Sequence, residues 1–348
     1  MFEYFKKISD KDRLYFFNRN FFTLDGLWVI KVEEQTNWDL TLNIDLEVWQ
    51  ELLQMAYKRI LERLKLNPDF LEDLVTALSF RWTIEGWKYD IKNISRNIIL
   101  INVEECPYKA VMERNPDRKG KISDICKKVC IPLYESIIIH FNSRIILRRE
   151  HFMGLGDNKC DFILNYKTKE FNEEKKLSKR RIHELISEKD RLFYFETNYM
   201  DLERLWIKKT IKHLGFEKTK EIHFKVNDEL YSTIFRRIRK YLNLSGESLN
   251  DLIKILSFIL ICEDYAHYFS IVNDKEVKLL IKKHFIEGAL TNINEINKYL
   301  ARFNDNAMFT AIKKAIEIHF STFSVEIKNL NEGKSSKYDI EMLIKSLR

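Results

Sequence analysis

The sequence predicts a mostly helical α+β protein built from two tandem repeats. Residues 12–80 match residues 190–258 without a gap at an offset of 178 residues, and 24 of the 69 positions are identical. Gly (9) and Pro (4) are scarce in a chain of 348 residues, which favours long helices over a turn-rich sandwich. A period of this length marks duplicated domains. We therefore expect a first repeat over 1–165, a charged linker over 166–187 and a second, degenerate repeat over 188–345.

Three amphipathic helices are expected to open each copy. Apolar side chains recur at three- and four-residue steps over 10–36, over 45–66 and over roughly 69–90. The pair Asn67-Pro68 supplies a stop and restart signal between the second and third of these helices.

A small β-α-β-β unit is expected to follow the helices. Residues 98–103 are β-branched and short, as in a strand, and residues 122–141 return to helical spacing. Residues 143–149 and 160–164 are again strand-like, and the glycines between them predict an antiparallel hairpin. The second copy repeats this order, with a turn at Gly333 and a last strand that begins near Tyr338.

The charge pattern and the apolar pattern exclude several classes of protein. The net charge of +7 comes from 59 basic and 52 acidic residues that are largely interspersed, so we expect no nucleic-acid partner. No stretch of 18 residues is free of charge, and the first residues lack the order of a secretory signal. We therefore expect a cytoplasmic protein without a membrane segment, whose cysteines are thiols or metal ligands and not disulfides.

The two copies differ most in their cysteines. The first copy holds Cys106, Cys126, Cys130 and Cys160. Cys126 and Cys130 lie four residues apart on a predicted helix, so they share a face, while Cys106 ends one predicted strand and Cys160 begins another. None of the four recurs in the second copy, where the matching or nearby residues are His284, Asp305, Phe309 and Tyr338.

Three interpretations of these thiols stay open. The four can be ligands of zinc or of an iron–sulfur cluster, although their spacing matches no C-x-x-C pattern. One of them, Cys106 or Cys160, can be an activated nucleophile. All four can instead be buried apolar fillers, because free cysteine is among the most buried residue types.

Four further residues are candidates for the same site. His140 can be a ligand or a general base, although His319 repeats it in the second copy and favours a packing role. Arg148 and Arg149 can hold a carboxylate in bidentate fashion, and Asp157 in the glycine turn completes the expected ligand-binding set.

Several motifs of the first copy resemble a known family. They are Arg19 to Trp28, Val103 to Pro107, the two helical cysteines, Arg148 and the stretch Gly154 to Phe162. Together they resemble uncharacterised prokaryotic proteins related to L-2-amino-thiazoline-4-carboxylate hydrolase, and the ending Gly-Asp-x-x-Cys-Asp-Phe is the most specific piece. The order of elements is also similar to the vinyl-4-reductase and haem–nitric-oxide-binding fold. The first resemblance implies hydrolysis of a cyclic C–N bond, and the second implies small-molecule binding.

These observations support three functional hypotheses. The leading one is a cytoplasmic protein that binds a small molecule or a metal at a cysteine-lined site in the first repeat. The second repeat then packs against the first as a scaffold or regulator. The alternative is a hydrolase with Cys106 or Cys160 as nucleophile or metal ligand and Arg148 or Arg149 on a substrate carboxylate. The third is a protein-interaction scaffold formed by the duplicated helices.

Overall fold

The computed structural model describes residues 5–95, 97–167, 186–246, 248–273, 275–282, 295–330 and 339–347. The chain forms two compact units. We call Val32–His213 the continuous unit, and Met1–Lys31 together with Leu214–Arg348 the split unit. Each unit contains helices and one four-stranded antiparallel sheet, which confirms the predicted mostly helical α+β class with two similar halves.

The longest helices in the described part of the continuous unit are α2 (Trp38–Leu64), α3 (Leu71–Glu85) and α9 (Glu188–Leu214). The Asn37 side chain caps α2 by accepting a hydrogen bond from the Leu40 N–H, so this helix begins earlier than residue 45. Gly86 ends α3 with a φ of 87°, a left-handed conformation that glycine adopts without strain. The expected helix over 69–90 is therefore shorter than predicted.

The sheet of the continuous unit has the strand order β1-β2-β4-β3. Its strands are β1 (Lys88–Ser95), β2 (Ile98–Glu105), β3 (Ile145–Arg148) and β4 (Cys160–Tyr166). The structure thus adds a strand to the expected β-α-β-β unit. The sequence concealed β1 because this strand lies at the edge of the sheet and carries mainly polar residues, as exposed edge strands do.

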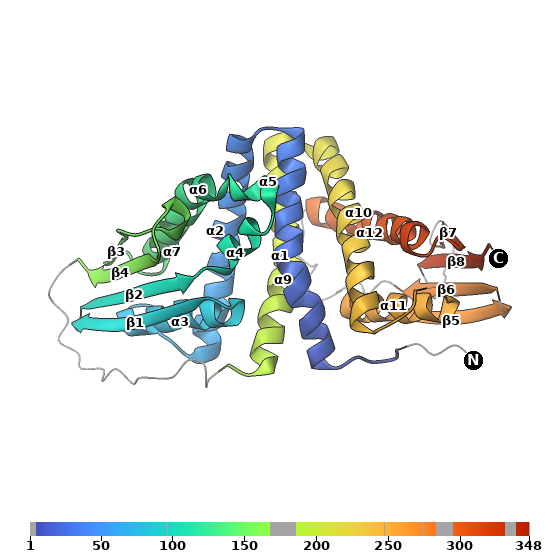
Figure 1. The fold of residues 1–348 in the computed structure, drawn as a ribbon, viewed down its shortest axis with the longest axis horizontal. Helices are drawn as coiled ribbons and strands as arrows, with labels where there is room; N and C mark the ends of the chain where they lie inside the picture. The colour runs from blue at the N-terminus through green and yellow to red at the C-terminus, as the bar shows by residue number, and fades with distance from the viewer. Residues whose placement is uncertain are drawn as a thin grey trace. The chain divides into compact units, whose positions relative to one another are not determined.

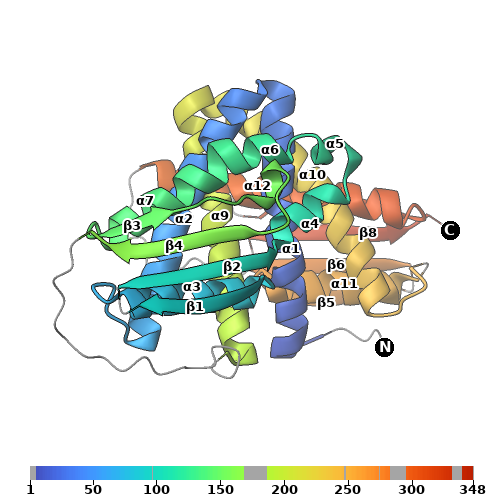
Figure 2. The same cartoon turned by 60° about the vertical axis from the view of Figure 1, so that its left-hand side comes forward.

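One face of this sheet packs on helices α3 and α7 (Ile131–Phe141), as Figures 1 and 2 show. Alternate residues of β2 are buried, and Phe162 on β4 meets Trp82 of α3 and Tyr134 of α7 at ring-centre distances of 4.9 Å each. The core of this unit therefore lies between the sheet and these helices.

The crossover between β2 and β3 is longer and less regular than a single helix. It passes through α4 (Pro107–Glu113), α5 (Pro116–Lys119), α6 (Ile122–Ile125) and a π-helical turn, η1 (Cys126–Cys130), before α7. The predicted helix over 122–141 is confirmed, but its middle is π-helical. Pro132 supplies a reason, because proline cannot donate the i→i−4 bond and its ring crowds the carbonyl of the preceding turn.

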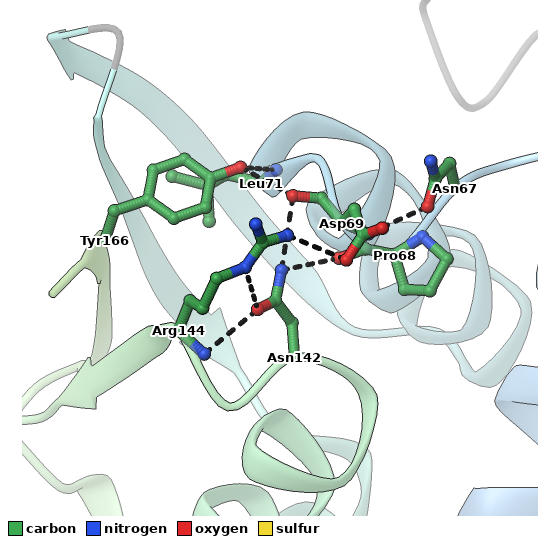
Figure 3. Close-up of polar contacts among 7 residues, drawn as sticks. All are labelled: Asn67, Pro68, Asp69, Leu71, Asn142, Arg144 and Tyr166. Carbon is green, nitrogen blue, oxygen red and sulfur yellow. Dashed lines mark hydrogen bonds and ion pairs between the residues drawn. The ribbon is translucent and has the colours of Figure 1, made fainter. Parts of the chain in front are cut away.

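The loop between α2 and α3 makes polar contacts with the residues just before β3 and with the end of β4 (Figure 3). Asn142 donates to the carbonyl oxygens of Pro68 and Asp69, at 2.9 and 3.2 Å. Arg144 pairs with the Asp69 carboxylate at 2.7 Å, and the Tyr166 hydroxyl bonds to the Asp69 carbonyl at 2.9 Å. These contacts fix the sheet relative to the helical part of the same unit.

The split unit repeats the architecture. Its helices are α1 (Asp10–Gln35), α10 (Phe216–Tyr241), α11 (Leu249–Cys262) and α12 (Glu295–His319). Its sheet has the order β5-β6-β8-β7, formed by β5 (Ala266–Asn273), β6 (Glu276–Lys282), β7 (Phe323–Asn329) and β8 (Ile340–Ser346). The expected turn at Gly333, together with His284 and Tyr338, lies outside the described residues, as does most of the expected linker over 166–187.

The compact units and the sequence repeats are not the same segments. The continuous unit begins within α1, after Lys31, and ends with His213, near the end of α9. Each unit therefore combines the body of one expected repeat with the first helix of the other. In the described part of the chain, no helix is both long and apolar enough to cross a membrane.

Candidate functional site

Arg149, directly after β3, is the centre of the candidate site. Its Nε donates to the Asp161 carbonyl at 3.0 Å, and its Nη1 lies 3.6 Å from the Cys130 sulfur. The guanidinium carbon lies 4.0 Å from the centre of the Phe162 ring and 4.6 Å from that of Phe152. Among the described residues, no carboxylate pairs with this half-buried cation, which is unusual because buried charges are normally paired.

Cysteines of the first copy lie around this arginine. Cys130 contacts it directly, and the Cys160 sulfur accepts a hydrogen bond from the Met153 N–H at 3.2 Å. Cys106, Cys126 and Cys160 each lie near Cys130, which acts to raise the pKa of all three. The structure therefore brings the four predicted cysteines into one region.

Burial dominates the acidity of these thiols. Burial, with a smaller contribution from neighbouring thiols, raises the pKa of Cys106 and of Cys126 to about 12. Burial also raises the pKa of Cys160, against the opposing effects of the Met153 N–H and of Arg149. These three side chains are thus neutral thiols at neutral pH, whereas a nucleophilic cysteine needs a lowered pKa.

The geometry does not favour a metal ion. Within the residues that the structure describes, no group of three or more His, Cys, Asp or Glu side chains is arranged to hold one. The guanidinium of Arg149 would also repel a cation placed among the thiols. The set Cys106, Cys126, Cys130 and Cys160 as metal ligands therefore stays a prediction.

The turn between β3 and β4 explains the glycine-rich motif. A Cβ atom on Gly154 would lie 2.0 Å from the Cys126 sulfur, so only glycine allows this close approach. Gly156 has a φ of 111°, and the Asp157 carboxylate accepts a hydrogen bond from the Phe152 N–H at 2.7 Å. The buried Asp161 carboxylate accepts hydrogen bonds from two further N–H groups, at residues 150 and 151, both at 2.8 Å. Asp157 thus shapes the turn.

Two predicted site residues lie away from the thiols. The Arg148 side chain is 65% exposed and pairs with Glu150 at 3.3 Å. His140 is exposed in the last turn of α7, and its ring contacts Phe141 at 4.9 Å. The two arginines therefore point in different directions, as their alternation along a strand implies.

A buried polar network behind the site was not predicted. Arg81 and Glu85 on α3 form a bidentate ion pair, with 2.9 Å for each contact and side chains that are 2% and 0% exposed. Arg81 also donates to the hydroxyls of Tyr57 and Tyr134, at 3.2 and 3.1 Å. Burial works to lower the pKa of Arg81, but the Glu85 charge outweighs it, so the guanidinium stays charged.

This network reaches the thiol region through Tyr134. The Tyr134 hydroxyl also accepts a hydrogen bond from Trp82 at 2.8 Å, and its ring lies 6.0 Å from the Arg149 guanidinium. The comparison of the copies held a signal for the network, because Ile259 replaces Arg81 in the second copy. A charged residue in one copy at an apolar position of the other distinguishes the two copies at this point.

The fold and the site define a two-unit α+β protein with one arginine centred among thiols. The chain is similar to a family of unknown function (DUF6125), whose model matches residues 8–150. This match includes Cys106, Cys126, Cys130 and Arg149 and ends before Cys160. No curated protein and no solved structure matches the chain significantly.

Proposed function

We propose that the continuous unit binds a small anionic molecule at Arg149, in a site lined by thiols and aromatic rings. The observation that carries this proposal is a half-buried guanidinium without a carboxylate partner among the described residues. A planar guanidinium suits bidentate binding of carboxylate or phosphate oxygens, and burial strengthens that interaction.

The position of the site suits a ligand from solution. The residues that flank Arg149 and the turn, namely Glu150, His151 and 155–158, are exposed. The aromatic faces of Phe152 and Phe162 hold the guanidinium in place, so little side-chain entropy remains to be lost on binding. Cys106, Cys126 and Cys160, whose pKa values burial raises, supply an apolar, polarisable lining that does not compete with the ligand for the positive charge.

The hydrolase alternative has weaker support. Its nucleophile was expected to be Cys106 or Cys160, and burial raises the pKa of both thiols. His140, the expected base, is exposed and its described ring contact is with Phe141. A cytoplasmic binding protein is therefore the function that we favour, with the hydrolase relation as a prediction from resemblance alone.

The two neighbouring arginines provide a matched test. Acetate, oxalate and inorganic phosphate are titrated separately into the parent chain, Arg149→Gln and the exposed control Arg148→Gln, and the thermal unfolding midpoint is recorded. We expect at least one of these anions to raise the midpoint of the parent and of Arg148→Gln, with no response in Arg149→Gln. No response in the parent, or an equal response in Arg149→Gln, would contradict the proposal.

A further inference from the structure

The first helix of each sequence copy lies in the compact unit that holds the body of the other copy. α9 opens the second copy but belongs to the continuous unit, which contains α2 and α3 of the first. α1 opens the first copy, and its residues up to Lys31 belong to the split unit, which contains α10 of the second.

Equivalent residues make equivalent contacts in the two units. In the continuous unit, Arg59 of α2 donates to the Asn198 side chain of α9 at 2.8 Å. In the split unit, Arg237 of α10 donates to the Asn20 side chain of α1 at 3.0 Å. Arg59 and Arg237 are related by the 178-residue offset, and so are Asn20 and Asn198. The same Arg–Asn pair therefore forms in both units, and in each unit it joins a residue of one copy to a residue of the other.

A second pair of contacts follows the same rule. Lys209 of α9 pairs with Glu51 of α2 at 2.7 Å, and Lys31 of α1 pairs with Glu229 of α10. These positions are also identical between the copies. Both kinds of contact join the first helix of one copy to the second helix of the other copy. They show that α1 and α9 take equivalent places in opposite units.

The exchanged helix α9 reaches the network behind the thiols. The Tyr194 hydroxyl of α9 donates to Glu85 at 2.5 Å, Glu85 holds Arg81, and Arg81 donates to Tyr134 at 3.1 Å. The Tyr134 ring lies beside Arg149. Every step of this chain of contacts is buried or half-buried and lies within the continuous unit.

We infer that the two copies exchange their first helices and that the second copy, through α9, completes the thiol site of the first. The step from the helix exchange to the site rests on the function proposed above. Phe16 and Ile259 occupy the positions of Tyr194 and Arg81 in the split unit, so the aligned residues there cannot form the same network. Tyr194 is thus a positioning residue that acts on the site through Glu85 and Arg81.

Cross-linking of the full-length chain tests the exchange. A protease site is placed between residues 168 and 185, and cysteine pairs are introduced as Lys31→Cys with Glu229→Cys, and Glu51→Cys with Lys209→Cys. Control pairs combine positions 31 with 51 and 209 with 229. Each chain is treated with a short bis-maleimide, cut and run on a denaturing gel.

The exchanged pairs should join the two fragments covalently, above the level seen with the parent cysteines. The control pairs should not join the fragments, because both members of each control pair lie in the same fragment. Labelling of each introduced cysteine with a monofunctional maleimide shows that its thiol reacts. Failure of both exchanged pairs to join the fragments would overturn the helix exchange, whatever the site binds.

Tyr194→Phe tests the link to the site, and Tyr231→Phe is its matched control. The Tyr231 hydroxyl donates to Glu263, the counterpart of Glu85, at 3.2 Å in the split unit. We expect alkylation of the site thiols to accelerate about threefold or more in Tyr194→Phe, because a loosened site exposes thiols that burial keeps protonated. Tyr231→Phe should react at the parent rate.

Mass mapping of the alkylated peptides identifies which cysteines react. Equal rates in Tyr194→Phe and the parent would overturn the link between α9 and the site. The anion titration of Arg149→Gln is a separate measurement, so a failure of the proposed ligand site is distinguishable from a failure of this link.

Discussion

The guanidinium carbon of Arg149 lies 4.0 Å from the centre of the Phe162 ring. This contact joins the end of β3 to β4 and places a predicted ligand-binding arginine at the centre of the thiol-lined candidate site. Phe162 belongs to the same motif that supplies Cys160 and Asp161, so one short segment provides a sulfur, a carbonyl acceptor and an aromatic face to the same cation.

Arg149→Lys should weaken the continuous unit. Lysine lacks the planar group that stacks on Phe162 and cannot keep both the Cys130 and Asp161 contacts, so we expect a loss of about 1–2 kcal/mol in the free energy of unfolding. Urea unfolding measures it. Arg148→Lys is the control and should leave stability unchanged, and equal effects of the two substitutions would show that the stacking is unimportant.

Gly154→Ala should destabilise the turn before β4. The added methyl group would meet the Cys126 sulfur at 2.0 Å and the Cys126 Cβ at 2.9 Å, so the turn or the π-helical segment must shift. Overpacking of this kind costs about 1–3 kcal/mol. Gly120→Ala is the matched control, because nothing lies within 4 Å of the added atom and φ is −67°. Calorimetric midpoints that fall equally in both variants would contradict this packing argument.

The stability of the protein should fall as pH rises above about 9. The ordinary thiol pKa is 9.0, and burial raises the pKa of Cys106 and Cys126 to about 12 in the folded state. The unfolded chain therefore loses these protons first, so their stabilising effect is complete below pH 9.0 and is lost as pH rises toward the folded value.

Each such thiol contributes a slope of up to about 1.4 kcal/mol per pH unit in this window. Urea unfolding of the parent and of Cys106→Ala/Cys126→Ala at several values between pH 8 and 10 measures the slope. The double variant should show a shallower decline. An unchanged slope would mean that the two thiols titrate at their ordinary pKa in the folded protein.

Glu85→Gln should be among the most damaging substitutions in α3. It leaves the Arg81 charge buried without its counter-ion, and removal of one partner of a buried pair costs about 3–5 kcal/mol. Glu263→Gln changes the equivalent residue of the second copy, where Ile259 stands at the place of Arg81, and should cost far less. Chemical denaturation of both variants compares them directly; similar losses would argue against a special role for the Arg81–Glu85 pair.

Most of the helical framework was predictable from the sequence because it depends on local patterns. The three- and four-residue spacing of apolar side chains located α1, α2 and α7, and short β-branched, strand-like runs beside a glycine turn located β2 and β4. The strand β1 was missed because its residues are mainly polar, and α3 was drawn too long because Gly86 was not recognised as its end.

The candidate site was predictable only in part. The cysteines found in one copy marked the region, and the structure places Cys126, Cys130 and Cys160 near Arg149 and Cys106 near Cys130. Nothing in the sequence distinguished Arg149 from Arg148, since the difference depends on which face of the sheet each side chain meets. The raised thiol pKa values likewise follow from burial, which the spacing of cysteines does not reveal.

The sequence by itself determined the repeat, the class of fold and the one copy that carries the four cysteines, because periodicity and residue type are local properties of the chain. The tertiary structure alone decided which helix packs on which copy. Asn20 and Asn198 are the same residue at the same place in each copy, and so are Arg59 and Arg237, so either pairing satisfies the same hydrogen bond. Only the path of the chain through the two compact units selects the crossed arrangement.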